Sequence, residues 1–304
     1  MSENVDLVKR LQKPAGKIEA VLDTDAYNEI DDQFALAYML LSGAQIDVKA
    51  VYAAPFHNHN SAGPADGMEK SYAEILKILG LMGRDEMKSR VFKGSRTYLP
   101  DEDTPVVSDA ARDLAERAMG CSPEKPLYVT AIGAVTNVAS AILMKPEIVN
   151  NIVVVWLGGH AHEWPHTAEF NMMQDVAAAR VLFGCGAAVV QVPCMGVASS
   201  FITTGPELEY RLWGKNRLCD YLVDIVLQEA PKDPSFCWSR VLWDVTAVAW
   251  LLGGYFTEDV LKSAPIPQYD NRYSFDGTRH PIGYVYAVNR DRLMSDLFKK
   301  LTEA

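Results

Sequence analysis

Residues 18–41, IEAVLDTDAYNEIDDQFALAYMLL, contain the pattern that decides the fold. The apolar run IEAVL predicts a buried strand, and DQFALAYMLL, which begins at Asp32, predicts a buried helix. A loop rich in acidic residues joins the two. A strand that passes through a loop into a helix is the repeating unit of α/β proteins with parallel sheets.

The same alternation recurs along the chain. Further strands are expected at 46–54, 126–132, 152–159 and 187–193, and helices at 72–79, 108–119, 136–145, 175–183 and 206–230. Strands that are apolar on both faces are typical of a parallel sheet covered by helices on both sides. The sequence therefore predicts a doubly wound α/β fold, with a mostly parallel sheet, helices on both faces and a helical insertion, in one domain spanning residues 1–304.

Composition and charge narrow the class of protein. The chain has 304 residues, of which 49% are hydrophobic and 22% charged, as in ordinary globular proteins. Its net charge of −10 disfavours a nucleic-acid polymer as partner. The five cysteines form no CxxC pair, and no long apolar stretch predicts a membrane span. A cytoplasmic protein without a membrane or nucleic-acid partner is expected.

The loop after the first strand is crowded with acid. Asp23, Asp25, Glu29, Asp31 and Asp32 follow one another within ten residues. Ligands of open α/β sheets bind at the carboxyl ends of the strands, where this loop lies. Neighbouring carboxylates raise one another's pKa unless a cation compensates them, and Ca²⁺ or Mg²⁺ prefers such oxygen ligands. A metal site is therefore predicted, although capping of the following helix could account for one or two of the aspartates.

Four motifs, in order, resemble those of the nucleoside hydrolase family. DTDAYNEIDDQFAL at 23–36 resembles the family signature DxDPGxDDxxA, and AIGAVTNVASAI at 131–142 resembles TGxLTNxAxA. AEFNMMQDVAAARVLF at 168–183 and LWDVTAVAWLL at 242–252 are similar to AEFNxxxDPEAAxxVF and HDPxAxA. The segment 279–298 also resembles the family's closing strand and helix. The resemblance implies a Rossmann-like α/β fold and hydrolysis of the N-glycosidic bond of a ribonucleoside, with Ca²⁺ as cofactor.

The resemblance also implies roles for individual residues in binding the cation. Asp25 is implied as a metal ligand and as the base that activates a metal-bound water. The other implied ligands are the side chains of Asp32 and Asp244 and the backbone carbonyl of Ile132. Asp23 is implied as a neighbour that supports the metal site.

Other matched positions are implied to contact the substrate. Asp31 is implied to bind the ribose hydroxyls, and Glu169 and Asn171 to hydrogen-bond the sugar. Asn58 or Asn60, in the loop after the second strand, is a further candidate sugar contact. Carboxylates near the sugar suit this chemistry, because cleavage of a glycosidic bond passes through an oxocarbenium-like state.

Two departures from the family pattern affect these roles. Five residues, 26–30, separate Asp25 from Asp31, where the signature has three and a Pro-Gly pair. The loop must bulge or extend, which could displace Asp31 or bring Asn28 or Glu29 into the site.

The second departure is Trp243, which stands where many members have a histidine that protonates the leaving base. An indole cannot act as a general acid. Purine-preferring members of the family also have tryptophan there, which predicts stacking of Trp243 on a purine base, with Trp164 as a possible second wall. The alternative is that Trp243 only packs in the core.

Two His-x-His pairs follow predicted strands. His57 and His59, and likewise His160 and His162, could contact substrate or leaving group, whereas zinc binding lacks a third ligand at suitable spacing.

Two alternatives to a nucleoside hydrolase remain open at this point. One is a noncatalytic nucleoside-binding protein that retains the metal site. The other is a haloacid-dehalogenase-type phosphohydrolase, because DTD after a first strand imitates its acid pair. By analogy with the family, a homodimer or homotetramer is expected.

Overall fold

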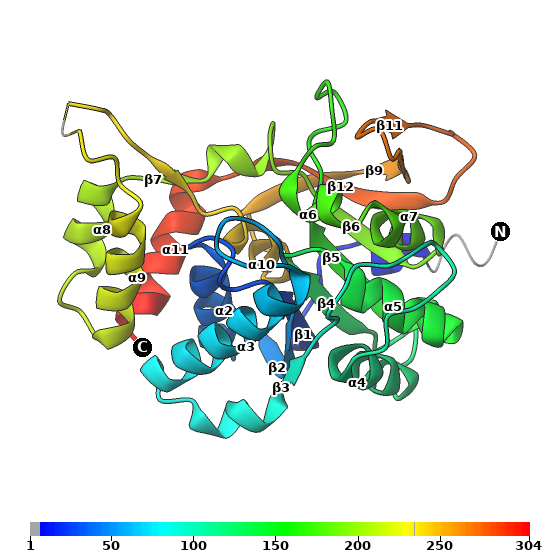
Figure 1. Cartoon of the computed structure of the whole chain (residues 1–304), viewed down its shortest axis with the longest axis horizontal. Helices are drawn as coiled ribbons and strands as arrows, with labels where there is room; N and C mark the ends of the chain where they lie inside the picture. The colour runs from blue at the N-terminus through cyan, green and yellow to red at the C-terminus, as the bar shows by residue number, and fades with distance from the viewer. Residues whose placement is uncertain (1–6, 234) are drawn as a thin grey trace.

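An eight-stranded sheet forms the centre of the molecule (Figure 1). The computed structural model describes residues 7–233 and 235–304. The strand order is β3-β2-β1-β4-β5-β6-β12-β9. The strands are β1 (Ile18–Thr24), β2 (Ile46–Ala53), β3 (Val91–Lys93), β4 (Leu127–Ala131), β5 (Ile152–Leu157), β6 (Ala188–Val192), β9 (Thr257–Ser263) and β12 (Pro281–Val288). All neighbours pair in parallel except β9, which runs antiparallel to β12.

Helices cover both faces of this sheet. The α-helices are α2 (Asp32–Leu41), α3 (Pro64–Leu81), α4 (Asp109–Met119), α5 (Thr136–Met144), α6 (Phe170–Gln174), α7 (Val176–Gly184), α8 (Gly205–Leu212), α9 (Arg217–Gln228), α10 (Val245–Leu251) and α11 (Arg290–Thr302). Short 3₁₀ helices lie at Asp85–Arg90, Pro146–Asn150 and Ala198–Ser200. Two-stranded ribbons pair β7 (Ile202–Thr203) with β8 (Arg240–Val241), and β10 (Ile266–Pro267) with β11 (Tyr273–Ser274).

Two apolar cores hold the helices to the sheet. Helices α4, α5 and α7 pack on one face, and α2, α3, α10 and α11 pack on the other (Figure 1). Along β1, Val21 faces the first core and Leu22 the second, because successive side chains of a strand point to opposite faces. The predicted doubly wound α/β fold is confirmed.

The predicted helix at 206–230 is two helices. Helix α8 ends at Leu212, and α9 begins after Asn216, whose side chain caps it by accepting from the Cys219 amide at 2.8 Å. Gly214, with a φ of 71°, turns the chain between them. Because Gly and an Asn cap mark a helix end and a helix start, this break could have been read from the sequence.

Strand order reverses at the centre of the sheet. From β1 the chain proceeds outward to β2 and β3, and then returns to the other side of β1 to form β4. Such a reversal leaves a crevice outside the carboxyl ends of the two central strands. The acidic loop leaves β1 at this point.

A buried glycine in α3 gives a test of this packing. A Cβ on Gly67 would lie 2.0 Å from the Phe56 carbonyl oxygen, whereas a Cβ on Gly80 in the same helix would meet only Lys88 Nζ at 3.7 Å. We expect Gly67→Ala to lower the free energy of unfolding by about 2 kcal/mol, as overpacking does. Gly80→Ala is the control and should be neutral or stabilising by up to about 1 kcal/mol. Urea unfolding measures both, and equal stabilities of the two variants would contradict this packing.

Candidate active site

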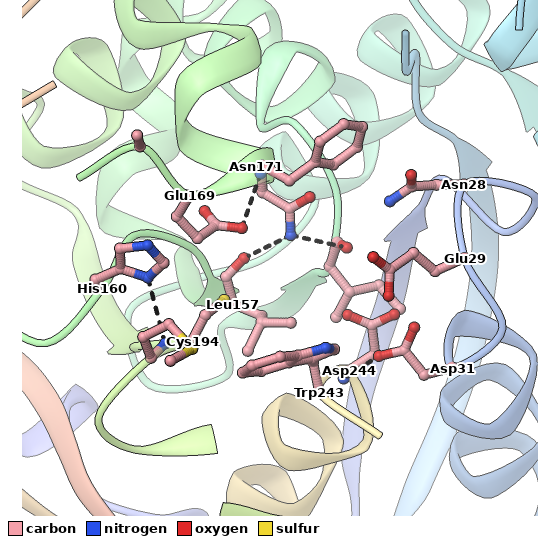
Figure 2. Close-up of a pocket in the computed structure, with 14 residues that line it drawn as sticks. Asn28, Glu29, Asp31, Leu157, His160, Glu169, Asn171, Cys194, Trp243 and Asp244 are labelled. Atoms are coloured by element: carbon pink, nitrogen blue, oxygen red, sulfur yellow. Dashed lines mark hydrogen bonds between the residues drawn. The ribbon is translucent and has the colours of Figure 1, made fainter. Parts of the chain in front are cut away.

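A cavity of about 240 Å³ opens at the carboxyl ends of the central strands (Figure 2). The loop after β1, the turn after β4, the end of β5 and the segment after β6 all contribute to it. Its lining residues are Asn28, Glu29, Asp31, Ile132, Leu157, His160, Ala168, Glu169, Phe170, Asn171, Cys194, Met195, Trp243 and Asp244. Six of the residues to which the family resemblance gives roles lie on this surface: Asp31, Ile132, Glu169, Asn171, Trp243 and Asp244.

Three aspartates converge at one end of the cavity. Asp31, Asp32 and Asp244 each offer a carboxylate oxygen, and these oxygens lie within 4.8 Å of one another. Asp31 occupies the N-cap position of α2 and Asp244 that of α10, yet neither side chain makes a capping hydrogen bond. Asp31 Oδ2 instead accepts from the Asp244 amide at 3.2 Å. Helix capping therefore does not explain these aspartates.

Asp25 is completely buried and lies near enough to Asp31 and Asp32 for their charges to raise its pKa, but it is not one of the three converging aspartates. Both of its carboxylate oxygens lack a hydrogen-bond partner among the described residues. A Cβ on Gly133, in the turn after β4, would lie 2.9 Å from Asp25 Oδ1, so a side chain there would crowd the carboxylate. An unpaired buried carboxylate is costly, so Asp25 would gain from a partner outside the described residues.

Two neighbouring aspartates have fixed protein partners. Asp23 Oδ1 accepts from Asn137 Nδ2 at 2.8 Å, and Asp32 Oδ1 accepts from Thr24 Oγ1 at 2.5 Å. These bonds orient the two carboxylates and leave an oxygen of each for other contacts. Asn137 belongs to the TNVASA motif, and its role in holding Asp23 could not be read from the motif alone.

Burial and mutual repulsion disfavour the ionised forms of these carboxyl groups. Burial raises the pKa of Asp23 and of Asp32 to about 7. Burial also raises the pKa of Asp25, Asp31 and Asp244 well above the usual range, and neighbouring carboxylates add to the effect. A bound cation reverses this balance, because it favours the charged form of each ligand. The donor set consists of hard oxygens and fits a hard divalent cation.

The opposite wall carries Glu169 and Asn171, at the start of α6 (Figure 2). Glu169 accepts from the backbone amides of Gly159, Asn171 and Met172 at 2.7–2.9 Å, so its carboxylate is held rigidly as a helix cap. Asn171 Nδ2 donates to the carbonyls of Ile132 at 3.2 Å and Leu157 at 3.0 Å. This amide therefore fixes the Ile132 carbonyl that was implied as a metal ligand.

The extended loop after β1 contributes its own residues to the cavity. Asn28 and Glu29 line it, as one of the sequence interpretations allowed, and Asp31 keeps its place there as well. Asn58 and Asn60 do not line the cavity. Asn58 Nδ2 donates to Asn28 Oδ1 at 2.6 Å, and Asn60 Nδ2 donates to the Asn28 carbonyl at 3.0 Å. The structure thus places both asparagines behind Asn28.

Arg240 connects this loop to the segment that precedes α10. Its guanidinium Nη2 lies 3.0 Å from Glu29 Oε2 and 2.8 Å from Glu229 Oε2. Burial raises the pKa of Glu29, and the charge of Arg240 opposes this rise. No local sequence pattern marks Arg240 as a site residue, because 211 residues separate it from Glu29.

Aromatic and imidazole groups complete the site. Trp243 lies along one side of the cavity (Figure 2). Trp164 is not among the lining residues, and its ring packs edge-on against that of His160, with 5.9 Å between the ring centroids. His160 lines the cavity and accepts from the Met195 amide, and burial lowers its pKa to about 4. Among residues 7–233 and 235–304, only the aspartate cluster gathers three or more potential metal-binding side chains, so neither His-x-His pair belongs to such a group.

Comparison with known proteins agrees with the fold and the motifs. The model of the inosine-uridine preferring nucleoside hydrolase family matches residues 20–267. A probable uridine nucleosidase 2 of Arabidopsis thaliana is 25% identical over 228 residues, which cover 68% of each chain. The pyrimidine-specific ribonucleoside hydrolase RihA of Citrobacter koseri is 26% identical over 247 residues, 73% of this chain and 76% of its own.

Solved structures share the architecture. A plant nucleoside hydrolase superposes with a TM-score of 0.73 at 20% identity, covering 96% of this chain and all of its own. A purine-preferring ribonucleoside hydrolase from Gardnerella vaginalis gives 0.73 at 19% identity, covering 94% and 98%.

The fold and the acidic cavity agree with a family of metal-dependent hydrolases. The chain belongs to the inosine-uridine preferring nucleoside hydrolase family. It is accordingly a hydrolase that acts on N-glycosyl compounds, and its substrate class is the ribonucleoside. In the described part of the chain, no helix has the length and apolar character needed to cross a membrane.

The raised carboxyl pKa values predict a pH dependence of stability without metal. The carboxyl groups of Asp23 and Asp32 have a pKa of about 7 in the folded protein and of about 3.8 in the unfolded chain. The folded state therefore binds these protons more tightly. The stability that these two groups contribute is therefore fully present below about pH 3.8 and is lost as pH rises through about 7. In chelator, we expect the thermal midpoint to fall between about pH 5 and pH 8, and Asp32→Asn to flatten the fall. Differential scanning fluorimetry measures this, and a midpoint that rises over the same range would contradict the assignment.

Proposed function

We propose that this protein is a Ca²⁺-dependent ribonucleoside hydrolase that prefers purine nucleosides and releases free base and ribose. The proposal rests mainly on the fully buried Asp25. Its two carboxylate oxygens have no hydrogen-bond partner in the described chain, and three converging aspartates lie nearby. A hard divalent cation compensates such a group. Trp243 at the cavity surface supports the purine preference.

We assign the cation to Asp25, Asp32, Asp244 and the Ile132 carbonyl. Ca²⁺ accepts six to eight oxygen ligands in flexible geometry, which suits carboxylates supplied by separate loops. When bound, such a cation lowers the pKa of water and templates a diol. Asp31 differs from Asp25 and Asp32 because it opens onto the cavity, and we assign it to the sugar hydroxyls.

The protein's own side chains would carry the remaining steps. Asp25 accepts the proton of the attacking water, since its oxygens are not engaged elsewhere in the described chain. Glu169 and Asn171, held rigidly by backbone contacts, hydrogen-bond the sugar and orient it. As the C–N bond breaks, positive charge develops on the sugar, and the surrounding carboxylates stabilise it.

The leaving base requires a different form of stabilisation. The indole of Trp243 donates hydrogen bonds but does not act as a general acid. We therefore assign Trp243 to stacking against the base, and solvent supplies the proton. A purine presents a larger face than a pyrimidine and gains more from this contact. The relatives in the comparison include both purine-preferring and pyrimidine-specific enzymes, so a nucleoside panel tests the preference directly.

Asp25→Asn should lower kcat by about 10³-fold, within the range expected for a lost general base. Chromatography of free base and ribose, with Ca²⁺ and with chelator, measures the loss. Asp224→Asn, an exposed change on α9, is the matched control and should keep full activity. Near-normal turnover by Asp25→Asn, or release that is insensitive to chelator, would refute the assignment.

Trp243→Ala should lower kcat/KM for purine nucleosides by about 10–100-fold, because stacking on a base contributes about 1–3 kcal/mol. The loss for pyrimidine nucleosides should be smaller. Trp243→Phe keeps an aromatic face and should recover most of the purine activity. If all nucleosides lose activity equally in Trp243→Ala, the residue has only a packing role.

A further inference from the structure

Asn28 is held in one orientation at the cavity wall. Its carbonyl accepts from Asn58 Nδ2 and Asn60 Nδ2, and its side-chain Oδ1 accepts from Asn58 Nδ2 at 2.6 Å. Both oxygens are thus engaged behind the wall. Asn28 Nδ2 donates to no atom of the described residues and points toward the cavity in Figure 2. The wall therefore presents an N–H donor of fixed direction.

Glu29 places an acceptor beside this donor. Its Oε2 lies 3.0 Å from Arg240 Nη2, which anchors the side chain, and Arg240 is anchored in turn by Glu229. Glu29 Oε1 makes no hydrogen bond within the described chain, and the carboxylate faces the cavity in Figure 2. The two consecutive residues of the extended loop thus present a donor and an acceptor side by side.

The position of Trp243 indicates what this pair would meet. A planar ring stacked on the indole uses its faces for stacking, so only its edge remains for hydrogen bonds. Asn28 and Glu29 line the same cavity as Trp243. In the view of Figure 2, Glu29 lies between Asn28 and the carboxylates of Asp31 and Asp244, and the indole stands beside these carboxylates. Glu169 and Asn171 are held by backbone contacts on the opposite wall, and the proposed function assigns them to the sugar rather than to the base.

We propose that Asn28 and Glu29 form a specificity pair that reads the edge of the nucleobase. Asn28 Nδ2 donates to a ring nitrogen or carbonyl of the base, and Glu29 Oε1 accepts from an adjacent amino or ring N–H group. The pair selects bases that carry a hydrogen-bond donor beside an acceptor. This inference rests on the proposed function, because it assumes that the cavity takes a nucleoside.

Adenosine and purine riboside distinguish the two contacts. Both have ring acceptors, but the base of purine riboside lacks an amino or ring N–H donor for Glu29. We expect the wild type to favour adenosine, and Glu29→Ala to reduce the ratio of the two kcat/KM values by about 10-fold or more. Asn28→Ala should lower kcat/KM for both nucleosides and leave the ratio nearly unchanged. Comparing ratios between variants removes the intrinsic reactivity of each nucleoside.

Asp224→Asn, the exposed change on α9, is the control. It removes a carboxylate that lies outside the cavity lining, and the adenosine to purine riboside ratio should stay at the wild-type value. Thermal midpoints and Ca²⁺ titrations of each variant report whether the fold and the metal site survive. Glu29→Gln, which keeps the shape and an acceptor oxygen, should give an intermediate ratio.

Two outcomes would overturn the specificity pair while leaving the proposed function intact. One is an equal loss for both nucleosides in Glu29→Ala, which would place Glu29 on the sugar. The other is full activity of Asn28→Ala. If no nucleoside is hydrolysed, the proposed function fails. The specificity pair is then tested by calorimetry, which compares the ratio of the Kd values for adenosine and purine riboside between the wild type and Glu29→Ala.

Discussion

The buried carboxylates at the end of β1 are the constraint on which the site depends. Since β1 lies between β2 and β4, the chain that leaves it enters the interior of the molecule, where carboxylates lose their hydration. Asn137 and Thr24 satisfy one oxygen each of Asp23 and Asp32, and Gly133 leaves room for Asp25. The protein thus orients a concentrated negative charge that it does not neutralise by itself, which explains why metal dependence and fold are linked in this family.

The two ends of the cavity differ in chemistry because different elements build them. The acidic end comes from the loop after β1 and the start of α10, and its carboxylates repel one another. The other end comes from the start of α6 and the segment after β6, and its polar groups are satisfied by the backbone. In the proposed function, a sugar bound between the two ends would meet rigid hydrogen-bonding groups on one side and charge on the other. Arg240 moderates the added charge of Glu29, and without it the extended loop would increase the repulsion.

Much of the fold could be predicted from the sequence because its signals are local. The apolar strands, the Ser108 cap of α4 and the positions of the catalytic motifs all follow from neighbouring residues. Strand β9 gave no such signal, because an exposed edge strand with charged residues lacks a continuous apolar run. Its antiparallel pairing with β12 depends on the closing strand rather than on its own sequence.

The amino-acid sequence alone determined which carboxylate and amide side chains could form the site. It also determined that these side chains would meet at one edge of the sheet, because they follow the carboxyl ends of parallel strands. Side-chain direction and partner choice needed the folded chain. Asn58 was expected near the sugar but lies behind Asn28, and Arg240 reaches Glu29 across 211 positions of sequence. Such contacts depend on the exact path of the extended loop, since an insertion of two residues changes which side chains face the cavity. Periodicity and motif spacing report burial and order, whereas hydrogen bonds between distant segments are fixed only when those segments pack together.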